Sequence, residues 1–251
     1  MKRFCFLLIF LFAGCKSHQI LELGAANLNT VGPVSIEANS FGGNITIVVD
    51  ETLNSAKVQV AQRDKMLKKG EEPREQITWN ASVQNGAKGE ILFVETLANH
   101  NPLKTLSADI IIRAPNIHHV TANTANGDIT IYGVSGQLSL ITSDGDIKVA
   151  TPLVMNNDVI IETRRGNIEF RIRGESSAKI DATAINGNAA LNMRYGDGQI
   201  LSGTTKSRVS ALFNDGVNSY TMRTVDGNIS IDIVEDPIGS EPLFNTEWIS
   251  W

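Results

Sequence analysis

The chain has 251 residues, with 22 Lys and Arg against 27 Asp and Glu, 42% hydrophobic residues and two cysteines. This composition is typical of a globular protein long enough for one large or two small domains. It excludes a polytopic membrane protein, because the only sustained apolar run lies at the N-terminus, and it excludes a fold held together by disulfides. The excess of acidic residues argues against a nucleic-acid-binding protein, which normally carries a basic surface.

The first fifteen residues predict an export signal. Lys2 and Arg3 precede the nine-residue apolar run from Phe4 to Phe12, which has the size of a signal-peptide core and is too short to span a bilayer. The segment Leu11-Phe12-Ala13-Gly14-Cys15 resembles the lipobox of bacterial lipoproteins. The resemblance implies that a signal peptide, residues 1–14, is cleaved and that Cys15 is acylated. The alternative is a generic cleaved signal peptide followed by a chance cysteine.

Cleavage before Cys15 changes the net charge of the chain, and acylation of Cys15 attaches the mature chain to a membrane. It removes Lys2 and Arg3, leaving 20 basic against 27 acidic side chains, a formal net charge of −7. Acyl chains contribute about 0.8 kcal/mol per buried methylene, so lipidation anchors a protein to a bilayer. The residue after the cysteine is Lys16 and not Asp, which in lipoproteins of this type implies the outer membrane of a bacterium with two membranes. We expect residues 15–35 to form a lipidated tether and an N-terminal cap.

A twelve-residue motif occurs six times and determines the expected fold. Its frame is a stretch with alternating apolar residues, then in most copies a Ser or Thr, two variable positions, a glycine, an Asp or Asn, and a second short apolar stretch. Alternating apolar residues predict strands with one buried face. Each copy therefore predicts two short strands joined by a glycine corner. The copies begin at Ile36, Val120, Leu138, Val159, Ile180 and Tyr220.

The glycine of each copy is expected to need a positive φ, and the following Asp or Asn to bond its own backbone in the turn. From Gly127 to Gly187 the corner glycines are 18, 21 and 21 residues apart, and the intervals of 40 and 84 on either side read as about two and four coils. The six corner glycines are Gly43, Gly127, Gly145, Gly166, Gly187 and Gly227.

A period near 20 residues with a repeated corner predicts an all-β protein, a single-stranded parallel β-helix or β-solenoid over residues 36–236. Each coil is expected to stack on the last at about 4.8 Å through main-chain hydrogen bonds. The alternative is a β-sandwich, since sandwich strands also recur every 8 to 12 residues.

Three segments depart from the repeat. Alternating strand patterns persist between residues 48 and 119, but the repeat is blurred there. Residues 63–75 carry charges of both signs with Gly and Pro, which predicts a solvated excursion loop; the alternative is a charged docking site. Residues 237–251 hold two of the three tryptophans and predict a cap over the open end of the solenoid; the alternative is an exposed aromatic recognition tail.

The segment Ser107-Ala108-Asp109-Ile110-Ile111-Ile112-Arg113-Ala114-Pro115, followed by Val120 and the Thr-x-x-Gly-Asp/Asn-Ile coils, resembles the bacterial "putative adhesin" family of β-strand repeats, a domain of unknown function. The resemblance covers roughly residues 36–234. It implies an exported or membrane-anchored protein and a right-handed coil. The family has no established catalytic residues, so the resemblance implies none in this chain.

The carboxylates at the corners are the candidate residues for catalysis or metal binding. Asp128 and Asp146 occupy the same repeat position in neighbouring coils, about 5 Å apart if the coils stack. Such a pair suits glycoside hydrolysis, and with Asp144 it is a weak candidate for a calcium site. The following coils carry Asn167 and Asn188 at that position, which favours turn residues. We therefore expect no metal and no other cofactor.

The pair Arg164 and Arg165 replaces the small or acidic residues of other corners and offers a possible contact for an anionic glycan. With no catalytic motif, the sequence predicts a non-enzymatic, lipid-anchored β-solenoid of the cell envelope, an adhesin-like binding or scaffold module whose partner is an envelope glycan or protein. One alternative is a carbohydrate-active β-helix enzyme, which needs a groove with clustered acids and aromatics. Another is an assembly or stress factor of the periplasm.

Overall fold

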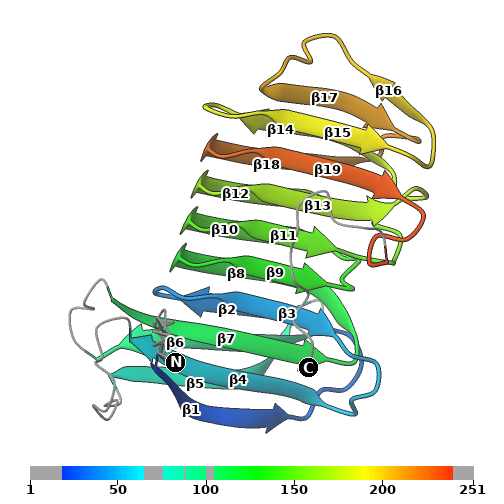
Figure 1. The fold of residues 1–251 in the computed structure, drawn as a ribbon. Helices are drawn as coiled ribbons and strands as arrows, with labels where there is room; N and C mark the ends of the chain where they lie inside the picture. Colours follow the sequence, from blue (N-terminus) through cyan, green and yellow to red (C-terminus); the bar gives the residue numbers. More distant parts are fainter. Residues whose placement is uncertain (1–18, 65–75, 88, 100–104, 240–251) are drawn as a thin grey trace, which may run out of the picture.

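The computed structural model describes residues 19–64, 76–87, 89–99 and 105–239. Within these ranges the chain forms β-strands and no helix, and the strands build two sheets that face each other along a tall stack (Figure 1). The strands are β1 (Gln19–Leu28), β2 (Val34–Ser40), β3 (Ile45–Val49), β4 (Ala56–Asp64), β5 (Ile77–Gly86), β6 (Gly89–Ala98), β7 (Leu106–Ala114), β8 (Ile117–Asn126), β9 (Ile129–Tyr132), β10 (Leu138–Asp144), β11 (Ile147–Ala150), β12 (Val159–Arg165), β13 (Ile168–Arg173), β14 (Ala178–Ala184), β15 (Ala189–Met193), β16 (Gly198–Ile200), β17 (Arg208–Phe213), β18 (Asn218–Asp226) and β19 (Ile229–Val234).

Each regular coil is one strand of the ten-stranded sheet followed, across a glycine corner, by one strand of the nine-stranded sheet. Neighbouring coils pair in parallel and in register, so that Ile129, Ile147, Ile168 and Ile229 form one column. All four side chains are at most 1% exposed and fill the space between the sheets. The stacking confirms the predicted all-β solenoid. The sandwich alternative is wrong, because a sandwich is built from antiparallel sheets.

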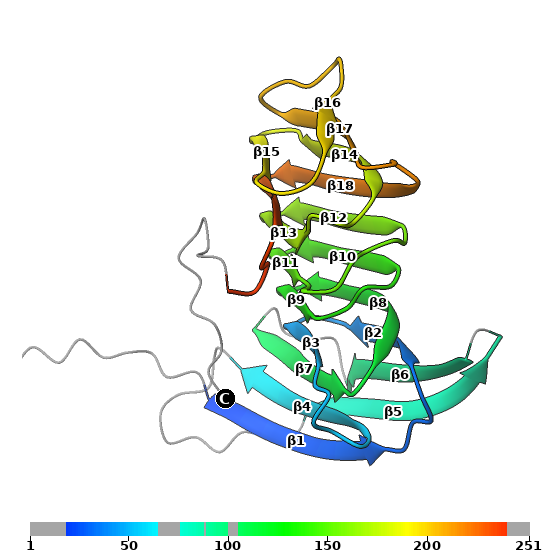
Figure 2. The same cartoon turned by 90° about the vertical axis from the view of Figure 1, so that its right-hand side faces the viewer.

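The coils do not stack in sequence order. The last coil in the chain, β18 and β19, lies between β12–β13 and β14–β15, and the first, β2 and β3, pairs directly with β8 and β9. Figure 2 shows β18 between β12 and β14. The interpretation of the 40- and 84-residue intervals as two and four successive coils is therefore wrong. The intervening strands instead extend the stack at its two ends.

At the N-terminal end, β6 and β7 continue the parallel stack, and the antiparallel strands β5, β4 and β1 follow. The prediction that Arg63 and Asp64 lie in the excursion loop is wrong. Strand β4 includes both residues, because its alternating burial pattern continues to Asp64, which is buried. Residues 65–75, the rest of that segment, lie outside the described residues.

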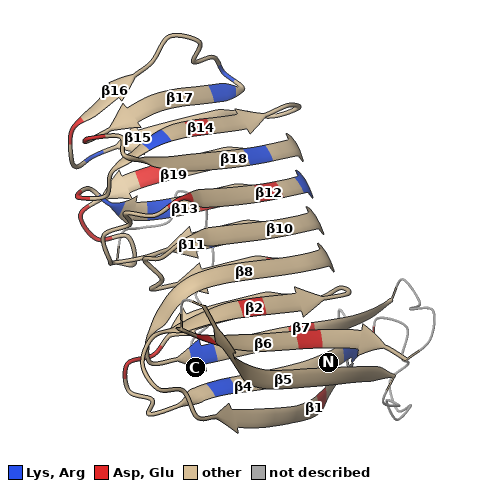
Figure 3. Cartoon of the chain, turned by 180° about the vertical axis from the view of Figure 1, so that it is seen from behind, with Lys and Arg blue, Asp and Glu red and all other residues tan. Residues whose placement is uncertain are grey.

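At the other end, β17 and β16 add antiparallel strands beyond β14. The expected cap over residues 237–251 falls outside the described residues beyond position 239, as do the signal peptide and Cys15. Among the residues described, there is no helix long and apolar enough to cross a membrane. Seen from behind, β12, β17 and β18 of the ten-stranded sheet carry arginines, whereas β8 and β10 carry no lysine or arginine (Figure 3).

Candidate functional site at the glycine corner

The six corner glycines form one continuous column along an edge of the solenoid. A Cβ added to Gly145 would lie 2.1 Å from the carbonyl oxygen of Gly127, and one added to Gly166 would lie 1.9 Å from that of Gly145. A Cβ added to Gly227 would likewise lie 1.9 Å from the carbonyl oxygen of Gly166, and one added to Gly187 would lie 1.9 Å from that of Gly227. No real Cβ packs that closely against a backbone atom, so the stack itself requires glycine at each of these six corners.

The expected positive φ explains only part of this requirement. Four corner glycines have a φ between 116° and 159°, whereas Gly187 and Gly227 do not have a left-handed backbone. The prediction is therefore confirmed for Gly43, Gly127, Gly145 and Gly166 and wrong for the other two. At all six positions the shared cause is the close approach of the neighbouring coil.

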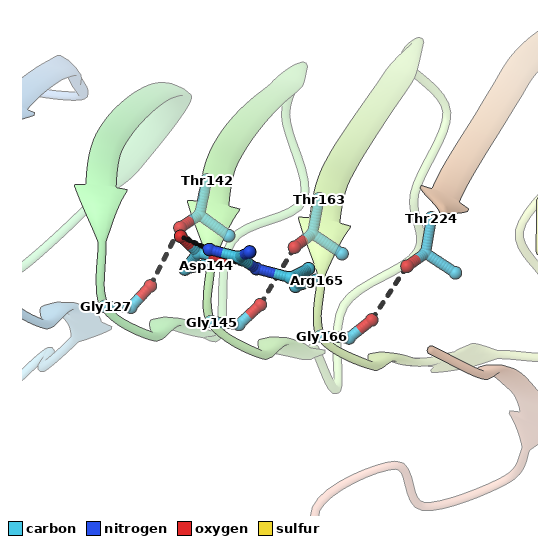
Figure 4. Close-up of polar contacts among 8 residues, drawn as sticks. All are labelled: Gly127, Thr142, Asp144, Gly145, Thr163, Arg165, Gly166 and Thr224. Carbon is cyan, nitrogen blue, oxygen red and sulfur yellow. Dashed lines mark hydrogen bonds and ion pairs between the residues drawn. The ribbon is translucent and has the colours of Figure 1, made fainter. Parts of the chain in front are cut away.

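A threonine ladder runs beside the glycines (Figure 4). The hydroxyls of Thr142, Thr163 and Thr224 donate to the carbonyl oxygens of Gly127, Gly145 and Gly166 at 2.8–3.0 Å. These side chains are buried, so each hydroxyl satisfies a carbonyl that the corner withdraws from the strand ladder. The Ser/Thr position of the repeat thus ties each coil to its neighbour.

The Asp or Asn after each glycine also bonds the neighbouring coil. Asp128 Oδ1 accepts the backbone N–H of Asp146 at 2.8 Å, and Asp146 Oδ1 accepts that of Asn167 at 2.7 Å. The pattern continues to Asn228 and Asn188. The expectation that these side chains bond their own backbone is wrong. Each side-chain oxygen instead accepts the backbone N–H of the equivalent Asp or Asn in the adjacent coil.

This ladder makes a direct prediction for Asp146. Replacing Asp146 by alanine leaves the N–H of Asn167 without its acceptor, so we expect a loss of about 1 kcal/mol in the free energy of unfolding. Asp146→Asn keeps an oxygen in place and is expected to stay close to wild type. Urea unfolding of both variants measures the difference, and an equal loss in the two would show that charge, and not the acceptor, matters.

The structure does not bring the calcium candidates together as a ligand set. Asp128 and Asp146 serve in the ladder, while Asp144, on the other side of the corner, forms an ion pair with Arg165. The part of the chain that the structure describes holds no group of three or more His, Cys, Asp or Glu residues placed to bind a metal ion.

We expect the protein to keep the same melting temperature in excess calcium and in excess chelator, because a ligand stabilises a fold only by binding the folded state. Differential scanning calorimetry of the mature protein under the two conditions checks this. A rise of more than a few degrees with calcium would contradict the assignment of the corner aspartates as turn residues.

A polar cleft of about 770 Å³ opens beside the first corners of the column. Its volume falls within the range of small-ligand sites. Strands β4 and β7 supply one wall, and the corners of the first coils supply the other. The lining residues are Phe41, Gly42, Gly43, Asn44, Arg63, Thr105, Leu106, Ser107, Asp109, Asn126, Gly127, Asp144 and Arg165.

Two ion pairs determine the electrostatics of this cleft. Arg63 pairs with Asp109, whose Oδ1 also accepts the backbone N–H of Asn44 at 2.9 Å. Asp144 pairs with Arg165, and the hydrogen bond from that guanidinium holds the pKa of Asp144 below its ordinary value, with a smaller contribution from the charge of Arg164. Both acids are therefore compensated, and Asp144 stays ionised at neutral pH.

The two arginines singled out from the sequence have separate surroundings. Arg165 lines the cleft and is engaged by Asp144. Arg164 lines a different groove, on the outer face of the ten-stranded sheet. A ligand contact at either residue stays a prediction.

The cleft contains residues that sequence reasoning missed, although a signal was present. Ala108, Asp109 and Ile110 pair in register with Gly43, Asn44 and Ile45, so they form a seventh corner. The Cβ of each corner residue points along the stack toward the end that holds β7, and no further corner lies beyond Ala108 in that direction. Alanine is therefore tolerated there. Allowing Ala at the glycine position would have identified this copy.

The fold and this edge define a parallel β-solenoid with glycine, threonine and Asx ladders and a polar cleft near one end. The family described as Toastrack DUF4097 matches residues 4–232, and the chain belongs to that family. This confirms the resemblance found in the sequence.

Two solved structures are similar to this chain. A "putative cell adhesion protein" from Clostridium sporogenes ATCC 15579 has a TM-score of 0.56 at 13% identity, covering 86% of this chain and 100% of that one. A "putative adhesin" from Bacteroides fragilis NCTC 9343 has a TM-score of 0.38 at 11% identity, covering 86% and 98%. No curated protein matches the chain. At 13% identity the first likeness shows a shared fold.

Proposed function

We propose that the protein is a non-enzymatic, adhesin-like binding module of the bacterial cell envelope, anchored by lipid on Cys15. The export signal and lipobox of residues 1–15 support the location in the cell envelope. The fold shared with a protein described as a cell adhesion protein supports the binding role. A rigid solenoid suits this task, because its outer faces and corner cleft hold their side chains in fixed positions.

The observation that carries the proposal is the state of the acids in the cleft. Acid–base hydrolysis needs a carboxyl group whose pKa is raised, so that it stays protonated at neutral pH. Asp144 has the opposite perturbation, and Asp109 is held by Arg63 and a backbone N–H. This chemistry favours a site that recognises polar groups over one that cleaves them.

A glycan panel separates binding from catalysis. We expect the purified mature protein to bind one or more envelope or extracellular polysaccharides while releasing no reducing ends and no unsaturated products. Asp144→Asn is the sensitive variant, because it keeps the shape of the side chain and removes its charge. Turnover by the wild type that Asp144→Asn abolishes would establish the carbohydrate-active enzyme instead.

The anchor is tested by detergent phase partition of cell extracts. We expect the wild type in the detergent phase and Cys15→Ser in the aqueous phase or as the uncleaved precursor, because the acyl chains provide the apolar area for partition. Equal partition of the two proteins, with both cleaved to the same length, would refute lipidation. Protease shaving of intact cells, followed through peptides from residues 63–74, then distinguishes a surface adhesin from a periplasmic assembly or stress factor.

A further inference from the structure

The outer face of the ten-stranded sheet carries a second depression, a groove of about 620 Å³ over β10, β12, β18, β14 and β17. It lies where Figure 3 shows basic positions on neighbouring strands. Three arginines from three different strands line it, Arg164, Arg208 and Arg223. The pairing register places Arg223 beside Glu162 and opposite Thr183, in the middle of the groove.

The positive charge in this groove is only partly compensated. Arg208 donates to Asp181 at 2.7 Å, so these two opposite charges neutralise each other. Arg164 and Arg223 are exposed, and neither forms a hydrogen bond or ion pair with another residue that the structure describes. Glu162 is the remaining acid, so the groove keeps a net positive charge on a protein whose mature chain is expected to carry −7.

Apolar side chains border these two arginines. Ile141 and Ile185, which line the groove, are 41% and 64% exposed, and Ile160 on the same face is 42% exposed. Isoleucine next to guanidinium suits a ligand with an apolar ring face and an anionic group. The groove lining has no Phe, Tyr or Trp, so it offers no stacking platform for a neutral sugar.

The backbone under the groove excludes recognition by strand addition. Strands β12, β14 and β18 are internal in the sheet and pair with a neighbour on each side. A peptide in extended form therefore finds no free edge to join. Side chains alone must recognise the ligand, and the planar guanidinium matches carboxylate oxygens in a bidentate geometry.

From these features we infer that the groove binds the carboxylates of an acidic polysaccharide, with Arg164 and Arg223 contacting successive uronate groups and Ile141 and Ile185 contacting the sugar rings. The inference rests on the proposed binding function and names its ligand class. The ligand lies across the strands, along the stacking direction, and the cleft at the glycine corner is not required for it.

Calorimetric titration of the purified mature protein with oligouronates is the test. We expect binding that weakens as salt is raised, and a loss of at least about tenfold in affinity for the double variant Arg164→Gln/Arg223→Gln, from the loss of two charge-assisted contacts. The matched control is Arg194→Gln/Lys57→Gln, which removes two exposed charges from elsewhere on the molecule and is expected to leave the affinity within about twofold of wild type. Equal melting temperatures for all three proteins confirm that the variants are folded.

Several results would overturn the inference. An equal loss in the control variant would mean that bulk charge, and not this groove, attracts the ligand. Tight binding of polyphosphate without binding of oligouronates would assign the arginines to phosphate. Binding of a neutral glycan that the double variant retains would remove this groove as the site and leave the proposed binding function standing. Absence of any oligouronate binding by the wild type would also refute it.

Discussion

Gly227→Ala is expected to destabilise the protein by more than about 4 kcal/mol, a loss at the upper end of single substitutions. The methyl group would lie 1.9 Å from the carbonyl oxygen of Gly166, and that atom belongs to the backbone of the neighbouring coil. Neither coil has room to move, because β18 and β19 are paired on both sides. Relief of the clash requires the corner to open and its ladders to break.

Two other glycines separate this cause from backbone strain. Gly203 has a φ of 93° with nothing within 4 Å of an added Cβ, so Gly203→Ala measures the left-handed backbone alone, about 1–2 kcal/mol. Gly42 has neither constraint, since its nearest contact would be Asn126 O at 3.7 Å, and Gly42→Ala is expected to be close to neutral. Urea unfolding of the three variants gives the order Gly227, Gly203, Gly42. A Gly227 loss no larger than that of Gly203 would disprove the stacking explanation.

The corner was predictable because every copy of the repeat solves the same local problem. The glycine, the Ser or Thr before it and the Asp or Asn after it recur at fixed offsets, and a fixed offset in a stacked coil becomes a column. The sequence could not show that the side chains bond the next coil. Thr163, for instance, donates to Gly145, 18 residues away, and nothing in its own segment distinguishes that carbonyl from nearer ones.

The order of the coils was not predictable from the period. Each coil has the same apolar frame, so any coil fits against any other, and spacing alone favours neighbours in sequence. The chain first places β4 to β7 at one end of the stack and β14 to β17 at the other, and it then returns to pair β8 with β2 and β18 with β12. The ion pair of Arg63 with Asp109 follows from this return, since 46 residues separate its partners.

The last coil in the chain is therefore expected to hold the end of the solenoid together. If residues 218–251 are deleted, β12–β13 and β14–β15 both lose their partner, because β18 and β19 lie between them. The deletion also removes the buried side chains Tyr220, Met222, Ile229, Ile231 and Ile233. At about 1.5–3 kcal/mol each, they contribute on the order of 10 kcal/mol, comparable with the whole stability of a typical domain. We expect the truncated chain to lose its cooperative unfolding transition and to aggregate through the four exposed strand edges.

A point substitution tests the same role in the intact chain. Ile231 is fully buried in β19, and Ile231→Ala is expected to cost about 2–5 kcal/mol. The matched control is Ile238→Ala, which removes the same atoms from a side chain that is 42% exposed and is expected to change the free energy of unfolding by less than about 1 kcal/mol. Chemical unfolding gives both values.

A sequence-ordered solenoid would be shortened by one coil when residues 218–251 are removed, and its remaining coils would stay folded. A soluble, cooperatively folded truncation would therefore contradict the insertion of the last coil between two earlier ones.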